Sequence, residues 1–324
     1  MGNKLDTLAI VVPCYNEEAV LEETSRRLIA VLDRVVGAGM VSPDSYVLYV
    51  NDGSGDRTWE IIARQHSENK RIHGVCLAGN VGHQNALIAG MTVAKESADI
   101  IVTIDADLQD DVDAIDRMIE EYRKGADIVY GVRNSRQSDS WFKRTTAKFF
   151  YKTMRRLGTG TVYNHADFRL MSHRAVEQLC LFRERNLFLR GMVPLIGFKT
   201  AEVGYSRGKR FAGESKYSFG KMLHFAIDGV TSFSVMPVRI IFYLGLAFIV
   251  IAILILAYVL VAYMSGRTTP GWTSLILSVW FCSGCVLVGI GVIGEYIGKI
   301  YLEVKDRPRY CIESILGEEK DSEP

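Results

Sequence analysis

The chain has 324 residues, enough for two soluble domains or for one catalytic domain with an attached segment. Its 38 lysine and arginine residues almost balance 37 aspartate and glutamate residues, so the overall charge does not favour a nucleic-acid-binding protein. Hydrophobic residues make up 48% of the sequence and charged residues 23%, a composition that excludes a wholly disordered chain.

Apolar runs and helically periodic segments alternate along the first part of the chain. We predict strands over residues 8–13, 46–50, 72–77, 100–104 and 126–130. Helices are predicted after Asn16, where apolar residues recur at helical spacing up to Val35, and over 59–65, 83–95 and the segment that carries Ile115 and Tyr122. Strands that alternate with helices indicate an α/β fold with a mainly parallel sheet covered on both faces.

Polar residues follow several of the predicted strands. They are Asn16 and Glu17, Asn51 and Asp52, Asp105 to Gln109, and Arg133. Ligands of such sheets bind beyond the carboxyl ends of the strands. We therefore expect the functional site at this edge of the sheet.

The acidic segment that begins at Asp105 has the pattern of a metal site. Asp105 and Asp107 stand one residue apart on a predicted turn, and Gln109 adds an amide oxygen. Two carboxylates at this spacing reach one hard divalent cation, which also takes phosphate oxygens and neutralises a departing diphosphate. Such acidic pairs are common on solvated loops, but a position after a buried strand, with Asp52 at another strand end, favours the metal site.

Basic residues follow the acidic segment and suit phosphate groups. They are Arg133, Lys143, Arg144, Arg207, Lys209, Arg210 and Lys216. Arginine offers planar, bidentate donors to the phosphates of a nucleotide or of a phosphorylated acceptor. Residues 207–218 are typical of a loop that closes over phosphates, or alternatively of a basic patch attracted to anionic lipids.

Asp167 lies between a polar turn and a predicted strand. The residue pattern leaves three roles open for its carboxylate. These roles are a catalytic base, an acceptor of a hydrogen bond from a sugar hydroxyl, and a helix cap.

Two long stretches lack charged residues, 240–265 and 271–294. Each exceeds the roughly 20 apolar residues that cross a bilayer, so we predict two membrane spans rather than two buried helices of a soluble core. Basic residues before the first stretch and after the second predict that both termini are cytosolic. Residues 140–157 and 217–235 mix aromatic and basic residues, which favours helices lying on the membrane surface over ordinary helices packed on the sheet.

The predicted organisation has three parts. Residues 1–235 form the cytosolic catalytic domain, 236–300 the two-helix transmembrane domain and 301–324 a cytosolic tail. Gly294 and Gly298 form a GxxxG pattern, which permits close helix approach and favours a homo-oligomer.

Six segments occur in an order that resembles family 2 glycosyltransferases. They are VVPCYNEE, VNDGSGDRT, GNVGHQNALIAGM, DADLQD, ADFRLMSHRAV and RFAGESKYS. With two predicted C-terminal spans, the chain is similar to bacterial polyprenyl-phosphate glycosyltransferases of the bactoprenol glucosyltransferase and dolichyl-phosphate mannose synthase type. The resemblance covers essentially the whole chain.

The resemblance implies a glycosyltransferase-A (Rossmann-like) fold and inverting transfer. A sugar moves from a nucleotide-sugar, with a UDP-sugar favoured, to undecaprenyl phosphate at the cytosolic face of a bacterial plasma membrane, for modification of a cell-envelope glycan.

By motif position, the resemblance also implies the binding residues. The nucleotide-sugar is held by Pro13, Tyr15, Glu17, Asp52 and Asp105. Mg²⁺ or Mn²⁺ is held by Asp105, Asp107 and Gln109. Phosphates of donor or acceptor are held by Arg133, Arg144, Arg207 or Arg210, Ser215 and Lys216.

Asp167 matches the position of the base proposed for the family. A phosphate monoester, however, has a second pKa of about 6 and is already anionic near neutral pH. It needs alignment more than deprotonation. We therefore predict that Asp167 serves positioning, and its action as a base stays open.

Two alternative functions are weighed against transfer to a lipid phosphate. A processive polysaccharide synthase is disfavoured, because two spans are too few for a translocation channel and the sequence has no QxxRW. A non-catalytic membrane scaffold or lipid carrier is disfavoured by the acidic segment and by the many phosphate-binding residue types.

Overall fold

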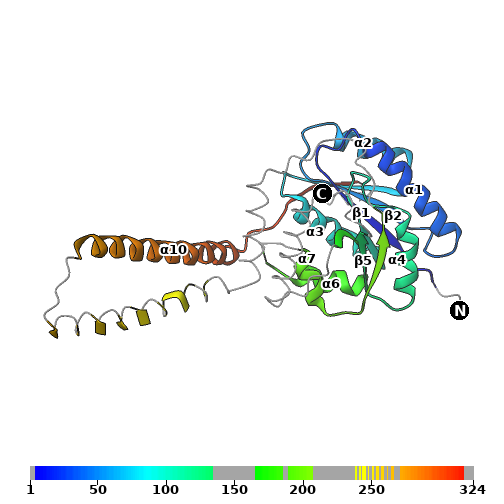
Figure 1. Ribbon diagram of the computed structural model, residues 1–324. Helices are drawn as coiled ribbons and strands as arrows, with labels where there is room; N and C mark the ends of the chain where they lie inside the picture. Colours follow the sequence, from blue (N-terminus) through cyan, green and yellow to red (C-terminus); the bar gives the residue numbers. More distant parts are fainter. Residues whose placement is uncertain are drawn as a thin grey trace. The chain divides into compact units, whose positions relative to one another are not determined.

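The computed structural model describes residues 4–133, 165–184, 189–206 and 271–316, and single residues between 238 and 265 (Figure 1). The chain divides into two compact units. Residues 1–217 and 307–324 form the first, and residues 218–306 form the second. Each unit is described by itself below.

The first unit contains an eight-stranded sheet in the order β7-β5-β6-β4-β1-β2-β3-β8. The strands are β1 (Leu8–Cys14), β2 (Tyr46–Asn51), β3 (Ile72–Leu77), β4 (Ile100–Thr103), β5 (Ile128–Arg133), β6 (His165–Ser172), β7 (Thr200–Tyr205) and β8 (Ile312–Leu316). The central strands β4, β1, β2 and β3 are parallel, as are β5 and β7. β6 is antiparallel to β4 and β5, and β8 is antiparallel to β3. The predicted mixed α/β class is confirmed.

Four helices of the first unit lie close to the predicted ranges, α1 (Leu21–Gly37), α2 (Thr58–Glu68), α3 (His83–Ala94) and α4 (Ala114–Arg123). The structure adds α6 (His173–Leu181) and the short α7 (Leu189–Met192), which continues into the 3₁₀ helix η1 (Val193–Ile196). The fifth predicted strand, 126–130, is displaced: β5 begins at Ile128 and continues to Arg133 because residues 131–133 still pair with β7.

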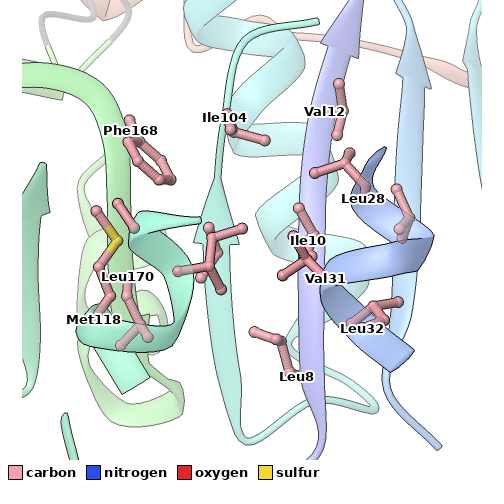
Figure 2. Close-up of a cluster of buried hydrophobic side chains, with 14 of the residues drawn as sticks. Leu8, Ile10, Val12, Leu28, Val31, Leu32, Ile104, Met118, Phe168 and Leu170 are labelled. Atoms are coloured by element: carbon pink, nitrogen blue, oxygen red, sulfur yellow. The ribbon is translucent and has the colours of Figure 1, made fainter. Parts of the chain in front are cut away.

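Apolar packing covers both faces of the sheet. Figure 2 shows Leu28, Val31 and Leu32 of α1 beside Leu8, Ile10 and Val12 of β1. On the opposite face α3 packs against β1 and β2. A Cβ atom at Gly90 of α3 would lie 2.5 Å from Val11 Cγ1 and 2.6 Å from Val50 Cγ2, so only glycine allows this approach. The two-sided cover predicted from the alternation of elements is therefore confirmed.

β8 pairs with the edge strand β3 after the chain has passed through the whole second unit. Ala78 N donates to Cys311 O over 2.9 Å, which extends the pairing towards the loop before α3. Arg309 Nη2 also donates to the carbonyl oxygen of Phe182. The segment predicted as a tail thus supplies an edge strand, which the sequence pattern did not reveal.

The second unit contains α10 (Trp272–Val304). Within the described residues, Phe281–Val304 is the one helical stretch long and apolar enough to cross a membrane. Its apolar side chains are largely exposed rather than packed in a core, as at Leu287 and Ile290. This exposure argues against a core helix of a soluble protein.

The predicted span over 240–265 is described only at single residues, all helical up to Met264, and the prediction of two spans stays a prediction. A Cβ atom at Gly289 would lie 3.3 Å from Ile241 Cγ2, so α10 and this helical stretch approach closely. Cβ atoms at Gly294 and Gly298 would meet no atom within 4 Å, and the homo-oligomer also stays a prediction. The segments 140–157 and 217–235 lie outside the described residues.

Candidate functional site

Several predicted site residues gather at one edge of the sheet. Asp52 directly follows β2, and Asp105 lies two residues beyond β4. β6 runs in the opposite direction, and its register pairs Thr103 with Arg169, so the start of β6 lies where β4 ends. Asp167 therefore comes to the same edge as Asp105. This edge is the one expected from the sequence.

The Asp52 carboxylate organises the loop that precedes α3. Its Oδ1 accepts from Val81 N over 2.7 Å and its Oδ2 accepts from Gly82 N over 3.0 Å. Burial raises the pKa of Asp52, although the two backbone N–H groups oppose the shift. The loop has little room, because a Cβ atom at Gly53 would lie 2.5 Å from Asn80 N. The structure thus gives Asp52 a loop-holding contact that the sequence did not suggest.

The other residues predicted to hold the nucleotide lie at the end of β1. Pro13 is buried within the strand and pairs with Val50, whereas the Tyr15 side chain is 51% exposed. Glu17 N donates to Thr58 Oγ1 over 2.9 Å, which ties this segment to the start of α2. The structure therefore leaves the exposed Tyr15 ring as a surface against which a planar base can stack.

The acidic segment after β4 forms a tight turn with buried oxygen atoms. Leu108 has a left-handed φ of 55°, a conformation that costs about 1 kcal/mol or more in a residue with a side chain. Asp107 Oδ1 accepts from Gln109 N over 3.1 Å. Asp105 Oδ1 is buried and, among the described residues, accepts no hydrogen bond. Burial raises the pKa of Asp105 to about 6.

These groups fit a hard divalent cation. A buried carboxylate oxygen without a hydrogen bond is costly unless a nearby charge compensates it, and carboxylate and amide oxygens are the ligands that Mg²⁺ prefers. Within the described part of the chain, no group of three His, Cys, Asp or Glu residues is placed to hold a metal. A cation here would depend on two carboxylates, the Gln109 amide and oxygen atoms from outside the protein.

Asp167 lies inside β6 and does not cap a helix. Its Oδ1 accepts from Arg169 Nη2 over 2.7 Å, and its Oδ2 accepts from Arg190 Nη2 over 3.1 Å. Arg190 Nε reaches Oδ1 over 3.3 Å, so this guanidinium contacts both oxygens. Burial alone would raise the pKa of Asp167, but the surrounding positive groups, Arg190 foremost, hold it well below its ordinary value.

His83 connects the two acidic groups. It is the first residue of α3, and its Nε2 lies 3.4 Å from Asp105 Oδ1 and 3.7 Å from Asp167 Oδ2. Burial lowers the pKa of His83, but the attraction of Asp167 and Asp105 outweighs burial and raises it. The sequence analysis included this residue in a motif and assigned it no role.

Arg133 lies at the end of β5, next to the acidic turn. Its Nε donates to Tyr205 Oη over 3.2 Å, and its Nη2 lies 3.6 Å from Asp110 Oδ1. Tyr205 Oη in turn donates to Asp110 Oδ1 over 2.5 Å. The predicted phosphate-binding arginine is therefore held in place by two residues that the sequence analysis did not select.

The structure brings together only part of the predicted set. Asp105 and Asp167 meet through His83, and Asp107, Gln109 and Arg133 lie on neighbouring elements of the same edge. Arg144, Arg207, Arg210, Ser215 and Lys216 lie outside the described residues. The sequence missed His83, Asp110, Arg169, Arg190 and Tyr205. Only the alternation of Asp167 and Arg169 along one strand face offered a signal for any of them.

Comparison with known proteins places the chain in a family. Residues 9–180 match Glycosyl transferase family 2. The glycosyltransferase YkoT of Bacillus subtilis is 51% identical over 99% of this chain and 95% of that protein.

Two other relatives have more specific names. The bactoprenol glucosyl transferase of Shigella phage SfII is 38% identical over 94% of this chain and 97% of that protein. The prophage bactoprenol glucosyl transferase homolog of Escherichia coli K12 is 36% identical over 95% and 99%. The predicted resemblance to this group is confirmed. Both the match over residues 9–180 and the similarity along the full length of these relatives show that the chain belongs to glycosyl transferase family 2.

Proposed function

We propose that the protein transfers a sugar, with inversion, from a nucleotide-sugar to a polyprenyl phosphate such as undecaprenyl phosphate. One observation carries the proposal: a family 2 glycosyltransferase chain places buried acids and arginines at one sheet edge and also contains a helix suited to a membrane. The acids suit a metal-bound diphosphate, the arginines suit a phosphate, and the helix suits an enzyme whose acceptor is a lipid.

The strand order supports a division of the site into a donor side and an acceptor side. Tyr15 and Asp52 follow β1 and β2, and the acidic turn follows the neighbouring β4. In this arrangement the nucleoside lies near β1 and β2, and the diphosphate lies at the acidic turn. A UDP-sugar is the favoured donor.

Asp105, Asp107 and Gln109 would hold a divalent cation, Mg²⁺ or Mn²⁺. The buried Oδ1 of Asp105, which accepts no hydrogen bond among the described residues, and the all-oxygen donor set support this assignment. When bound, such a cation supplies charge neutralisation for a leaving diphosphate.

The acceptor is proposed from two observations. Relatives similar along the whole chain are named bactoprenol glucosyl transferases, and α10 contains a candidate membrane span. We propose that transfer occurs at the cytosolic face of a bacterial plasma membrane, with both termini cytosolic, and that the lipid-linked sugar serves modification of a cell-envelope glycan.

Membranes that contain the full-length protein, incubated with radiolabelled nucleotide-sugars and undecaprenyl phosphate, test this function. The expected product is a lipid that carries one sugar and releases it in mild acid. Formation of a long polymer would instead identify a processive synthase. No transfer from any donor, with the protein present and folded in the membrane, would overturn the proposal and favour a non-catalytic role.

A further inference from the structure

Arg190 lies between the buried Asp167 carboxylate and solvent. It belongs to α7, its side chain is 37% exposed, and the Asp167 side chain beneath it is 11% exposed. Leu189 N donates to Gln84 Oε1 over 2.7 Å, which fixes α7 to the beginning of α3. Arg190 is therefore held at a defined place with part of its side chain accessible.

Asp167 is occupied by positive groups on both oxygens. Arg169 is almost completely buried and donates to Oδ1, and Arg190 contacts both oxygens. Arg169 Nη1 is buried and, in the described part of the structure, makes no hydrogen bond. One carboxylate therefore faces two guanidinium groups.

A third arginine, Arg133, lies at the same edge of the sheet. Burial and the like charge of Arg190 both lower the pKa of Arg133, although its contacts with Tyr205 and Asp110 prevail and raise it. Arg133 and Arg190 come from different elements, and each is paired with a buried acid. Two arginines that are each anchored by a buried acid at the same sheet edge suit an anion that bonds to both.

The strand order indicates which anion Arg133 and Arg190 bind. Along the sheet, β2, β1, β4, β6 and β5 follow one another. The donor residues lie at the ends of β1 and β2, and the proposed metal ligands follow β4. Arg133 ends β5 and Arg190 contacts Asp167 of β6, so we assign both arginines to the acceptor side. A nucleophile in an inverting displacement must approach from the side opposite the leaving diphosphate.

We propose that Arg190 binds the phosphate of the lipid acceptor, together with Arg133, and that the main role of Asp167 is to hold Arg190 in place. This inference rests on the proposed transfer to a polyprenyl phosphate. In that reaction an acceptor phosphate oxygen forms a bond to the anomeric carbon while the bond to the nucleoside diphosphate breaks and its electron pair leaves with the diphosphate. The dianionic monoester has no proton to lose, so the step needs no base.

Steady-state kinetics of the full-length protein test the proposal. Rates are measured against undecaprenyl phosphate at saturating UDP-sugar, and against the UDP-sugar at saturating lipid. We expect Arg190→Gln to raise the KM for undecaprenyl phosphate by about tenfold or more and to leave the KM for the UDP-sugar within about twofold. Arg34→Gln, which removes an exposed arginine paired with Asp116 between α1 and α4, should change neither.

Two further variants keep the test decisive. Arg190→Lys retains the charge but not the bidentate geometry, so the KM for the lipid should be intermediate, and this variant decides the matter if the glutamine variant does not fold. Asp167→Asn should raise the KM for the lipid as well, and the double variant with Arg190→Gln should be little worse than either single one, because both act through the same contact. A fall in kcat with an unchanged lipid KM in the Arg190 variants would overturn the proposal.

A binding measurement separates this inference from the proposed function. The wild type should bind undecaprenyl phosphate more tightly than undecaprenol, and Arg190→Gln should lose most of that preference. If the wild type transfers no sugar but shows the preference, and Arg190→Gln loses it, the function fails and the inference stands. If the wild type transfers sugar and Arg190→Gln keeps the full preference, the inference fails and the function stands.

Discussion

His83 Nε2 lies 3.4 Å from Asp105 Oδ1, although His83 begins the helix α3 and Asp105 lies in the turn after β4. The same nitrogen lies 3.7 Å from Asp167 Oδ2. One imidazole thus stands between two carboxylates that would otherwise repel each other across the site.

Replacement of His83 by Ala should lower kcat by about tenfold or more, because the two carboxylates lose the group that holds them together. His83→Gln keeps an N–H donor and should recover part of the rate. His173→Ala, at the start of α6 and outside the site, is the control and should keep full activity. Wild-type rates in the alanine variant would show that the contact has no role in turnover.

Asp105→Ala or Asp107→Ala should reduce turnover by about a hundredfold or more while the protein stays folded and membrane-bound, because the proposed cation loses a carboxylate. Asp113→Ala removes an exposed acid paired with Arg34 near the same turn and should have little effect. In the wild type, a chelator should abolish transfer, and added Mg²⁺ or Mn²⁺ should restore it. Near-normal rates after chelation would contradict the metal assignment.

The ion pair between Asp127 and Arg174 should make stability depend on pH. Arg174 donates to both oxygens of Asp127, over 2.6 and 2.5 Å, and lowers the pKa of this acid, against burial and with help from Ser172. The folded state therefore holds this proton less tightly than the unfolded state, so the contribution is full above the ordinary pKa of about 4 and disappears as the pH falls through the folded pKa.

Asp127→Asn should lower the melting temperature by roughly a few degrees near pH 7. The difference from wild type should shrink below about pH 4, where the wild-type carboxyl also becomes protonated. Thermal unfolding of the purified full-length protein across this range measures both. A difference that is constant over the whole range would rule out the charge as its source.

Gly90→Ala should destabilise the first unit by about 1–3 kcal/mol, because the new methyl group would overlap the side chains of Val11 and Val50. Gly37→Ala, at the end of α1, meets no atom within 4 Å and should be tolerated or slightly stabilising. The free energy of unfolding of each variant tests the pair. Equal values for both would mean that α3 moves away at little cost.

Removal of residues 312–324 should reduce solubility and the melting temperature, because the edge of β3 loses its partner and unpaired strand edges promote aggregation. Removal of 317–324 alone leaves β8 in place and serves as the matched control. Size-exclusion chromatography of both variants in detergent gives the comparison. Similar monodisperse behaviour would show that β8 contributes little.

The central part of the fold could be predicted from the sequence, because strands β1 to β4 are continuous apolar runs between amphipathic helices. β6 was harder to recognise, since Asp167 and Arg169 interrupt its apolar residues with charges that pair with each other and with Arg190 and His83 in the folded chain. β8 has no fully buried residue and pairs with a strand far away in the sequence, so no local pattern distinguishes it.

Site residues that come shortly after a buried strand, such as Asp52 and Asp105, could be predicted from the sequence. Residues that depend on contacts across the sheet could not be predicted. Arg190 is in a four-residue helix with no motif of its own, and only the folded chain brings it to Asp167. In the sequence, Tyr205 looks like an ordinary strand residue, and only the structure shows that its hydroxyl group donates to Asp110.

The position of β8 has a consequence for biosynthesis. Cys76 of β3 and Glu313 of β8 are in contact although 237 positions separate them in the sequence, so β3 gains this partner only after the ribosome has made the whole intervening chain. By then the apolar helix α10 has already been made. Final closure of the sugar-transfer domain is therefore a late event that follows synthesis of the hydrophobic segment, and ribosome-bound intermediates should expose an open β3 edge until that moment.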